Sequence, residues 1–306
     1  MLLQWNLNNK DLHEKYVKLY DDEFEIYFES IVQNILSFSK VKVLTISGPT
    51  SSGKTTTALK LAEHLKDGGM STQIISMDDF YKDRSESPKK ADGTPDFETI
   101  DAIDTDLLIR CLNEAIISGR TKLPRYSFKA GARKPESVDF ELCEHEMIIM
   151  EGMHGLNPRI LDNLPSENVK SIYTTIGEKV FLPNDIIFSK RDIRLLRRLI
   201  RDYKYRGASP EYTFLLWDGV RESEDLYIFP YENNAHIKIN SFYKYELNVV
   251  KKQALNLLAE IKEDSRYYIK AQELMHKLSY VLSIDEEHVP SHSVIREFIG
   301  DSMYYN

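Results

Sequence analysis

A glycine-rich segment between two contrasting stretches constrains the fold of this chain more than any other feature. Positions 48 to 55 read Gly-Pro-Thr-Ser-Ser-Gly-Lys-Thr, which satisfies the pattern G-x-x-x-x-G-K-[ST]. An apolar run at 41–47 precedes it, and a helix-forming run at 56–65 follows it. In that context backbone N–H groups can turn inward around an anion at the start of a helix. The sequence therefore predicts a phosphate-binding loop rather than a chance glycine-rich turn.

The residues of this loop have separate predicted roles. The ammonium of Lys54 places a positive charge on the terminal phosphates, and the hydroxyl of Thr55 can ligate Mg²⁺. We expect the following residues to bind the nucleotide phosphates: Gly48, Ser51, Ser52, Gly53, Lys54, Thr55 and Thr56.

Short β-rich runs alternate with helical stretches along the chain. The expected strands are 41–47, 73–77, 146–150, 171–176 and 236–240, and several are apolar with little alternation. Strands buried on both faces and separated by helices indicate a parallel sheet wrapped by helices. We expect an α/β fold, a P-loop NTPase-type three-layer sandwich with a mainly parallel sheet. Helical patterns at 11–38, as one helix or two, and after 241 add N- and C-terminal helices.

Composition narrows the class of protein. The formal net charge of -8 over 306 residues argues against a surface that binds nucleic acid as a whole. Cys111 and Cys143 have no C-x-x-C partner, so we expect two buried free thiols. Neither a leader-like N-terminus nor a run of about 18 apolar residues occurs, so the sequence predicts a cytoplasmic protein without a membrane segment.

Two acidic sites follow predicted strands. Asp78 and Asp79 come after the strand at 73–77, and Glu151 ends the run at 146–150. The carboxyl ends of parallel strands meet at the edge where ligands bind. An aspartate there could accept a hydroxyl proton or hold Mg²⁺, and Glu151 is placed to support a magnesium shell together with Thr55. A solvated turn and a salt-bridged acid are the structural alternatives.

The basic segment 190–207 predicts an amphipathic helix. Ile193, Leu196, Ile200 and Tyr203 share one side, and Arg191, Arg194, Arg198 and Arg201 share another. We expect this helix to pack by its apolar side and to present a cationic face that neutralises a transferring phosphoryl group. A solvated basic face or a nucleic-acid patch is the alternative. The polar segment 81–101 is expected to be a functional loop or a surface excursion.

Taken together, these motifs resemble those of the uridine kinase and phosphoribulokinase family. The resemblance rests on 48–55, Asp78-Asp79-Phe80-Tyr81, 97–104, Tyr126-Ser127-Phe128, Glu151-Gly152 and 194–207. It covers about residues 41 to 250, which implies a kinase domain at 41–250 between a helical segment at 1–40 and a helical extension at 251–306. The end of the chain, 291–300, is similar to that of larger bacterial uridine-kinase-like proteins.

The resemblance implies roles for single residues. Asp78 would be the general base, acting with the catalytic residues Lys54, Arg198 and Arg201, and Arg206 would join the lid over the nucleotide. Tyr81, Phe97, Glu98 and Tyr126 would surround the acceptor. The acceptor side departs from the uridine kinase pattern, because Gly131 replaces a histidine, Ala208 an arginine, Leu216 a glutamine and Glu98 an aspartate. Missing hydrogen-bond partners weaken selection of a particular base.

The leading hypothesis is therefore an ATP- and Mg²⁺-dependent kinase of uridine kinase type, with a nucleoside or similar small molecule as acceptor. A kinase for another sugar or sugar phosphate is the nearest alternative. An ATP-binding regulatory protein and an RNA-binding module that uses the arginine helix belong to other classes. The sequence gives no indication of the oligomeric state.

Overall fold

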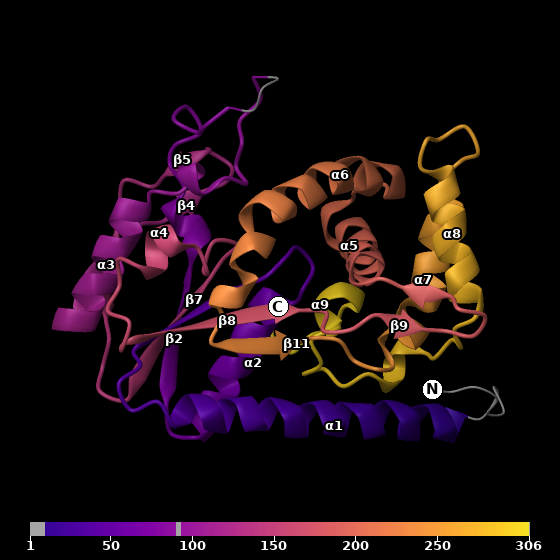
Figure 1. Ribbon diagram of the computed structural model, residues 1–306, viewed down its shortest axis with the longest axis horizontal. Helices are drawn as coiled ribbons and strands as arrows, with labels where there is room; N and C mark the ends of the chain where they lie inside the picture. The colour runs from indigo at the N-terminus through magenta and orange to yellow at the C-terminus, as the bar shows by residue number, and fades with distance from the viewer. Residues whose placement is uncertain (1–9, 90–92, 306) are drawn as a thin grey trace.

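Five parallel strands form the centre of the protein in the computed structural model, which describes residues 10–89 and 93–305. Their order across the sheet is β11-β8-β1-β7-β2 (Figure 1), and every neighbouring pair is parallel. The strands are β1 (Val43–Ser47), β2 (Ser71–Ser76), β7 (Glu146–Glu151), β8 (Val169–Thr175) and β11 (Ile237–Asn240). Each predicted strand is confirmed, with its ends shifted by no more than a few residues.

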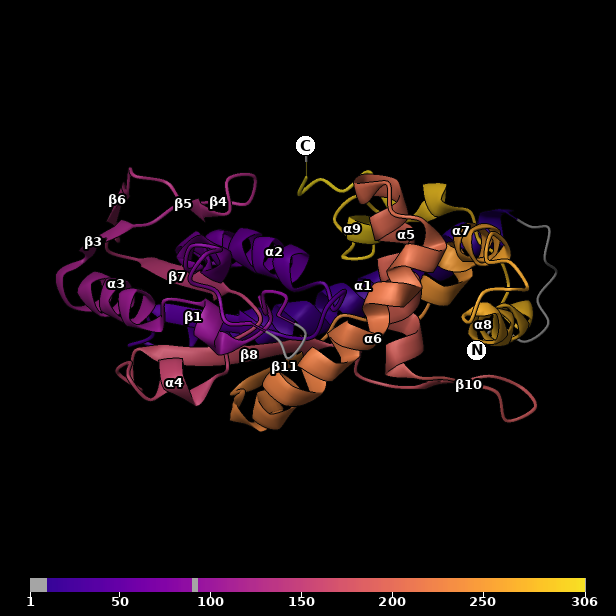
Figure 2. The same ribbon diagram turned by 90° about the horizontal axis from the view of Figure 1, so that it is seen from above.

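Helices cover both faces of this sheet because its strands are apolar on both faces. Leu44 and Ile149 belong to one buried cluster, whereas their neighbours Val43 and Ile148 belong to another. Helices on the first face include α1 (Lys10–Leu36) and α2 (Lys54–Asp67), and those on the second are α3 (Thr105–Ser118) and α4 (Pro158–Leu161). The view from above shows these layers (Figure 2). The predicted three-layer α/β fold of P-loop type is confirmed.

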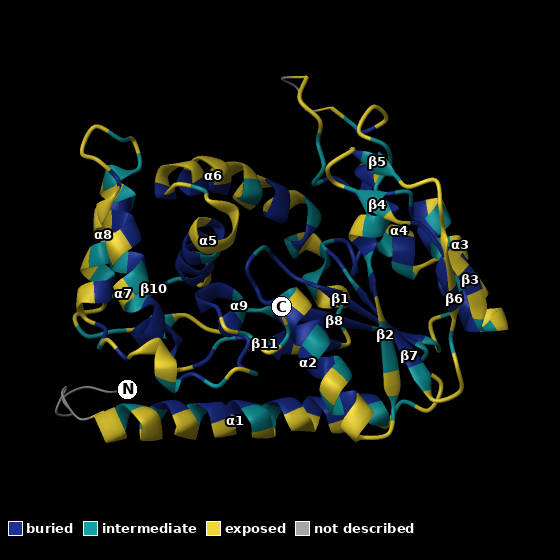
Figure 3. Cartoon of the chain, turned by 180° about the vertical axis from the view of Figure 1, so that it is seen from behind, coloured by how far each residue is buried: buried dark blue, intermediate teal, exposed yellow. Residues whose placement is uncertain are grey.

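Terminal helices complete the first layer. The predicted N-terminal helix is a single helix, α1, which runs along the base of the molecule. The C-terminal helices are α7 (Glu246–Ala259), α8 (Tyr268–Ser279) and the short α9 (Arg296–Ile299). One buried cluster joins Phe28 of α1, Leu61 of α2, Leu258 of α7 and Phe298 of α9. The inward sides of these helices are buried and their outward sides exposed (Figure 3).

The remaining elements lie outside the five-stranded sheet and the helices named above. A pair of long helices, α5 (Lys190–Arg206) and α6 (Pro210–Tyr227), stands above the carboxyl edge of the sheet. Short antiparallel pairs join β3 (Arg120–Leu123) to β6 (Val138–Glu141), β4 (Tyr126–Ser127) to β5 (Ala132–Arg133), and β9 (Val180–Phe181) to β10 (Ile187–Phe188). The 3₁₀ turns are η1 (Met77–Phe80), η2 (Ile100–Ala102), η3 (Phe229–Asn234) and η4 (Glu286–His288).

Some expectations need correction or lie outside the structure. Cys111 is buried as expected, but Cys143 is exposed, because it lies in the loop between β6 and β7. Tyr203, expected on the packing side of the arginine helix, is 49% exposed. Residues 1–9 of the expected N-terminal segment and 90–92 of the polar segment lie outside the described residues. The boundaries expected at residues 40 and 250 stay predictions.

Candidate active site

The loop at 48–55 joins β1 to α2 and turns its backbone toward the N-terminus of that helix. Gly53 has φ of 82°, the left-handed region that glycine adopts without a Cβ penalty, and it is the N-cap of α2. No side chain caps the helix, and its first turn contains no acidic residue. An uncapped helix N-terminus with free N–H groups attracts an anion. This geometry suits a phosphate group.

Lys54 lies at the same helix end. Its Nζ donates to the carbonyl oxygen of Pro49 at 3.1 Å, which keeps the ammonium folded over the loop. Burial lowers the pKa of Lys54, and the nearby carboxylates of Glu151, Glu297 and Glu224 act against that shift. Desolvation strengthens the attraction between an ammonium and an anion. Lys54 is thus surrounded by acids on several sides at the edge of the sheet.

Two buried ion pairs fix the phosphate loop from helix α5. Arg194 forms a bidentate pair with Glu224 of α6 at 2.5 and 2.8 Å, and both side chains are 2% exposed. The same carboxylate accepts from the backbone N–H of Thr50 at 2.8 Å, and Arg194 donates to the Thr50 carbonyl at 3.1 Å. No pattern in the sequence singled out Glu224. The loop is therefore positioned by the helices above it.

Arg197 makes the second connection. It donates to both oxygens of Glu246 at 2.6 Å, to the carbonyl of Ser51 at 3.3 Å, and to the hydroxyl and carbonyl of Ser241. Ser241 in turn donates to the carbonyl of Ser52 at 2.6 Å. Arg197 is fully buried. The sequence signal for this contact was an acid, Glu246, beside the apolar residues Leu247, Val249 and Val250 at the start of α7.

The arginines of α5 do not form the solvated basic face that was the alternative interpretation, whereas the cationic face toward the phosphates stays a prediction. Arg194, Arg197 and Arg198 are buried, and Arg191 pairs with Asp225 of α6. The predicted lid residues Arg198, Arg201 and Arg206 all contact one carboxylate, that of Asp202, which is itself buried. The predicted apolar side of this helix is confirmed for three of its residues, because Ile193, Leu196 and Ile200 are buried. The side chains of Arg194, Arg197 and Arg198 are buried as well, because carboxylates of α6 and α7 and that of Asp202 on α5 form ion pairs with them.

Asp78 lies opposite the loop, in η1 directly after β2. Its side chain is exposed to solvent at the carboxyl edge of the sheet, while nearby protein atoms still desolvate its carboxyl group in part. This desolvation, followed by the charge of Glu151, raises the pKa of Asp78 to about 6, while Lys54 acts in the opposite direction. Asp78, Glu151 and Lys54 therefore form one cluster of charges. A carboxylate with a pKa near neutrality is suited to accept a proton.

The carboxylate of Asp79, unlike that of Asp78, forms hydrogen bonds within the part of the chain that the structure describes. Its carboxylate accepts from Arg125 at 2.6 Å and from the backbone N–H of Tyr126 at 3.1 Å. These bonds hold β4 against η1. Within the described residues no hydrogen bond to the Asp78 carboxylate occurs, so the two aspartates divide into one structural acid and one acid turned to the site.

Aromatic rings surround the expected acceptor position. Tyr81 lies 5.7 Å from Tyr126 and 6.4 Å from Phe97, measured between ring centroids, and Phe128 lies 5.2 Å from Tyr126. The Tyr81 hydroxyl donates to the carbonyl of Phe97 at 3.0 Å. The structure thus brings three of the four expected acceptor residues into one wall.

The fourth expected acceptor residue, Glu98, follows this wall along the chain. Its carbonyl lies 3.0 Å from Nε2 of His154, a buried residue that the sequence did not single out. The charge of Glu98 also contributes to the raised pKa of Asp78. Glu98 is therefore on the acceptor side of the site, close to the proposed base.

Arg84 fills the place next to Gly131. Gly131 has φ of 68°, and a Cβ added there would lie 2.8 Å from Nε of Arg84. The guanidinium also lies 6.0 Å from the centroid of Phe97 and donates to the carbonyl of Phe128 at 3.4 Å. At the other departures, Ala208 follows the end of α5 and Leu216 is 39% exposed on α6. An exposed arginine, rather than a histidine, therefore borders the aromatic wall.

Oxygen donors suited to Mg²⁺ lie at the loop. The Thr55 hydroxyl is on an exposed residue in the first turn of α2, and the Glu151 carboxylate ends β7 beside β1. Ser76 donates to Glu151 at 2.9 Å and orients that carboxylate. Mg²⁺ prefers such oxygen ligands together with substrate phosphates. Thr56 differs from Thr55, because its side chain is fully buried beneath the C-terminal segment.

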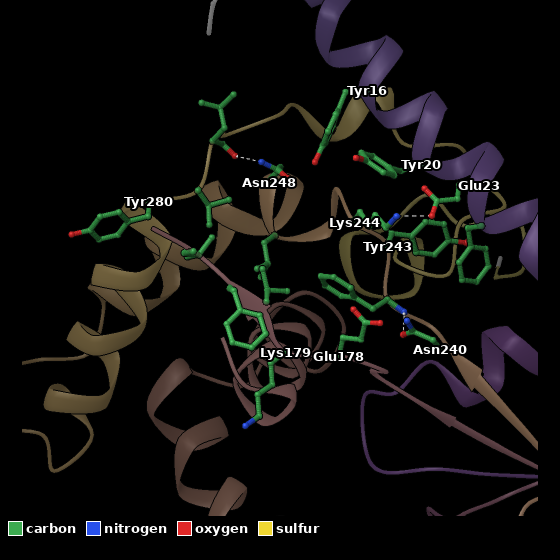
Figure 4. A pocket seen from close by; sticks show the side chains of 18 of the residues that line it. Tyr16, Tyr20, Glu23, Glu178, Lys179, Asn240, Tyr243, Lys244, Asn248 and Tyr280 are labelled. Atoms are coloured by element: carbon green, nitrogen blue, oxygen red, sulfur yellow. Dashed lines mark hydrogen bonds and ion pairs between the residues drawn. The ribbon is translucent and has the colours of Figure 1, made fainter. Parts of the chain in front are cut away.

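A cavity of about 650 Å³ lies away from this cluster of charges. It opens between α1, the segment at 178–183 and the start of α7 (Figure 4), and Tyr16, Tyr20 and Tyr243 line it. Lys244, bonded to Glu23, lies on the same wall. No residue of the phosphate loop lines this cavity, so the candidate active site is defined by its chemistry and not by the volume of a pocket.

Comparison with known proteins identifies the family of this chain. Residues 43–247 match the model of the Phosphoribulokinase / Uridine kinase family. A uridine kinase of Clostridium novyi (strain NT) is 32% identical over 167 residues, which are 55% of this chain and 71% of the relative. A uridine kinase of Brevibacillus brevis is 28% identical over 221 residues, 71% of this chain and 94% of the relative. A solved structure of a possible uridine kinase from Bacillus stearothermophilus has 22% identity and a TM-score of 0.41 over 49% of this chain and 80% of that chain.

The fold and the loop define a P-loop kinase. The family match covers more than half of the chain, so this protein belongs to the phosphoribulokinase and uridine kinase family, whose members are small-molecule kinases. Among residues 10–89 and 93–305, no helix is both long and apolar enough to cross a membrane.

Proposed function

We propose that this protein is an ATP- and Mg²⁺-dependent phosphotransferase of uridine kinase type that acts in the cytoplasm. It transfers the γ-phosphoryl group to a hydroxyl of a nucleoside or a similar small acceptor. The observation that carries the proposal is the position of Asp78, whose pKa of about 6 reflects burial and the charge of Glu151 beside Lys54. A proton acceptor and a phosphate-binding lysine then face one another across the carboxyl edge of the sheet.

The proposed reaction divides among the residues of the site. The Lys54 ammonium and the N–H groups at the start of α2 bind the β and γ phosphates. Asp78 takes the proton of the acceptor hydroxyl as the acceptor oxygen bonds to the γ phosphorus, and the bond between that phosphorus and the β–γ bridging oxygen breaks to release ADP. Thr55 and Glu151 would hold Mg²⁺, which neutralises charge on the phosphate oxygens. Arg198, Arg201 and Arg206 stabilise the transferring group and help exclude water as the lid closes.

A panel of acceptors tests this proposal. The protein is incubated with Mg-ATP and nucleosides, pentoses or sugar phosphates, and acceptor-dependent release of ADP is measured for the wild type and for Asp78→Asn. We expect the substitution to lower kcat by about 10²- to 10⁴-fold, the usual contribution of a general base. Asp139→Asn is the matched control, because the Asp139 side chain is 90% exposed on β6.

Release of ADP that needs no acceptor and is unchanged in Asp78→Asn would contradict the kinase proposal and favour an ATP-binding regulatory protein. Salt-dependent RNA binding without ADP formation would favour the nucleic-acid alternative. The burial of Arg194 and Arg197 in ion pairs argues against that outcome, because neither guanidinium is exposed to an RNA backbone.

A second acceptor class is favoured by one observation. Arg84 borders the aromatic wall beside Gly131. A guanidinium at that place suits an acceptor with a phosphate or carboxylate group, such as a sugar phosphate. For such an acceptor Arg84→Gln would raise KM at least about tenfold. For a neutral nucleoside the same substitution would leave KM close to the wild-type value, which separates the two acceptor classes.

A further inference from the structure

The segment 293–305 covers the phosphate loop from the side of α5. In both ribbon views α9 lies beside α5, close to the start of α2 (Figures 1 and 2). A Cβ added to Gly53 would lie 2.6 Å from Cγ1 of Val294. The ring of Phe298 lies 4.9 Å from the Arg197 guanidinium that also holds the loop. The loop therefore has a cover made by a part of the chain more than 200 positions away in sequence.

Two side chains of this segment bind the first turn of α2. The hydroxyl of Thr56 donates to Oε2 of Glu297 at 2.5 Å, and the hydroxyl of Tyr305 lies 2.8 Å from the same Thr56 oxygen. A hydroxyl has a single proton to donate. Because Thr56 gives that proton to the carboxylate, Tyr305 donates to Thr56. The result is a chain of bonds from Tyr305 through Thr56 to Glu297.

The charge of Glu297 falls where the phosphates of a nucleotide would bind. The first turn of α2 carries no acid of its own, and a negative charge near a helix N-terminus is stabilised there. Glu297 also acts on Lys54, since it is among the carboxylates that oppose the lowering of the Lys54 pKa by burial. One carboxylate from the C-terminal segment is thus bonded to Thr56 in the first turn of α2 and lies close enough to Lys54 to act on it by its charge.

The two ends of this segment differ in how they are held. Val294, Phe298 and Ile299 are fully buried, so α9 is part of the core. Beyond it, residues 301–305 lie at the surface, where Tyr305 is 42% exposed and Tyr304 reaches Glu63 of α2 at 2.7 Å. We call residues 301–305 the C-terminal strap. Besides the two tyrosines, the strap is held by a bond from the Met303 N–H to the Ser291 carbonyl at 3.0 Å and by the pair of Asp301 with Arg296 at 3.8 Å. Because it is less buried than α9, it is the part of the cover that can move at the smaller cost.

We propose that Glu297 and the C-terminal strap oppose donor binding, so that a nucleoside triphosphate must displace the strap from Thr56 before the donor site is complete. The identity of this ligand rests on the proposed function. Glu297 opposes binding by its charge, and Tyr305 holds the strap across the start of α2. Binding of the donor and release of the strap are then coupled in both directions.

Affinity for a non-hydrolysable ATP analogue with Mg²⁺, measured by calorimetry without any acceptor, tests the coupling. Glu297→Gln removes the charge but keeps an oxygen that can accept from Thr56, and it should bind about 2- to 30-fold more tightly than the wild type. Tyr305→Phe keeps the ring and loses the bond, and it should bind about 2- to 10-fold more tightly. Glu287→Gln and Tyr280→Phe, at exposed positions of η4 and the end of α8, should bind like the wild type.

Hydrogen exchange of the strap gives a second readout in the unaltered protein. The analogue should speed exchange at residues 301–305, because their bonds to α2 are released. Equal or weaker binding by both Glu297→Gln and Tyr305→Phe would overturn the proposal. Slower exchange in the strap on binding would overturn it too, since the strap would then stay in place and be stabilised by the bound nucleotide.

The experiments distinguish failure of the proposed function from failure of the proposal about the strap. A protein that binds the analogue more tightly after Glu297→Gln, but phosphorylates no acceptor, contradicts the proposed function alone. A protein that transfers phosphate, but whose Glu297→Gln and Tyr305→Phe variants bind the analogue like the wild type, contradicts only the proposal that the strap opposes donor binding. Absence of nucleotide binding in the wild type and both variants would overturn both.

Discussion

Arg197 and Glu246 form a fully buried bidentate ion pair, with both nitrogen to oxygen distances at 2.6 Å. The remaining guanidinium nitrogen reaches the carbonyl of Ser51 in the phosphate loop. The pair therefore connects α7 with the loop through a single side chain. Its strength depends on both partners, because a buried charge without its partner keeps the full cost of desolvation.

Glu246→Gln should destabilise the protein strongly. Loss of the carboxylate leaves the Arg197 guanidinium buried without a counter-charge, and we expect a decrease of about 3–5 kcal/mol in the free energy of unfolding. Urea denaturation measures the decrease. Glu141→Gln is the control, because its pair with Arg120 is exposed and should contribute no more than about 1 kcal/mol. Equal effects of the two substitutions would contradict a structural role for the buried pair.

The rate of phosphoryl transfer should depend on the protonation of Asp78. Burial and Glu151 raise the pKa of this carboxyl to about 6, and only its ionised form accepts a proton. The rate should therefore be maximal above pH 7 and fall by about tenfold per pH unit below the pKa. The profile of kcat/KM with the preferred acceptor measures this. The same acidic limb in the residual activity of Asp78→Asn would assign the titration to another group.

Gly53→Ala should impair both stability and nucleotide binding. Gly53 has a φ of 82°, and its new Cβ would lie 2.6 Å from Val294. Gly207→Ala isolates the backbone contribution, since Gly207 has a φ of 61° but no atom within 4 Å of the added Cβ. We expect Gly207→Ala to cost about 1 kcal/mol and Gly53→Ala clearly more. Thermal unfolding compares them, and equal shifts would show that the Val294 contact relaxes without cost.

His154 should contribute to the pH dependence of stability. Burial lowers its pKa from 6.5 to about 4, so the unfolded chain binds a proton more readily than the folded protein between these values. The contribution of His154 to stability is therefore present above pH 6.5 and is lost as the pH falls toward 4. Unfolding free energies measured across this window should fall less steeply for His154→Gln than for the wild type. Parallel curves would contradict a neutral, buried imidazole.

The sheet and the phosphate loop could be predicted because their signals are local. The apolar run before Gly48 and the helix after Lys54 lie within one strand–loop–helix unit, and the period of hydrophobic residues identified Ile193 and Leu196 as packing residues. These patterns depend on neighbours only a few positions apart. The position of Asp78 beside the phosphate loop followed from the same logic, because the carboxyl ends of parallel strands share an edge.

The environment of the arginines could not be predicted in this way. Helical periodicity places Arg194 on a polar side of α5, and a polar side is normally solvated. Its partner Glu224 lies 30 residues away, and the partner of Arg197 lies 49 residues away. Nothing in the local pattern indicates that α6 and α7 return to cover α5. The contact of Glu297 with Thr56 is still more remote in sequence.

That separation has a consequence for the order in which the protein assembles during synthesis. Thr56 and Glu297 are 241 positions apart, so the ribosome has completed the loop, the sheet and the lid helices before the cover of the loop emerges. Contacts between distant segments form late in folding because closing a long loop is entropically unfavourable. During translation the phosphate loop is therefore synthesised well before the residue that covers it. Glu297 is therefore absent from the first turn of α2 until 241 further residues have been added after Thr56.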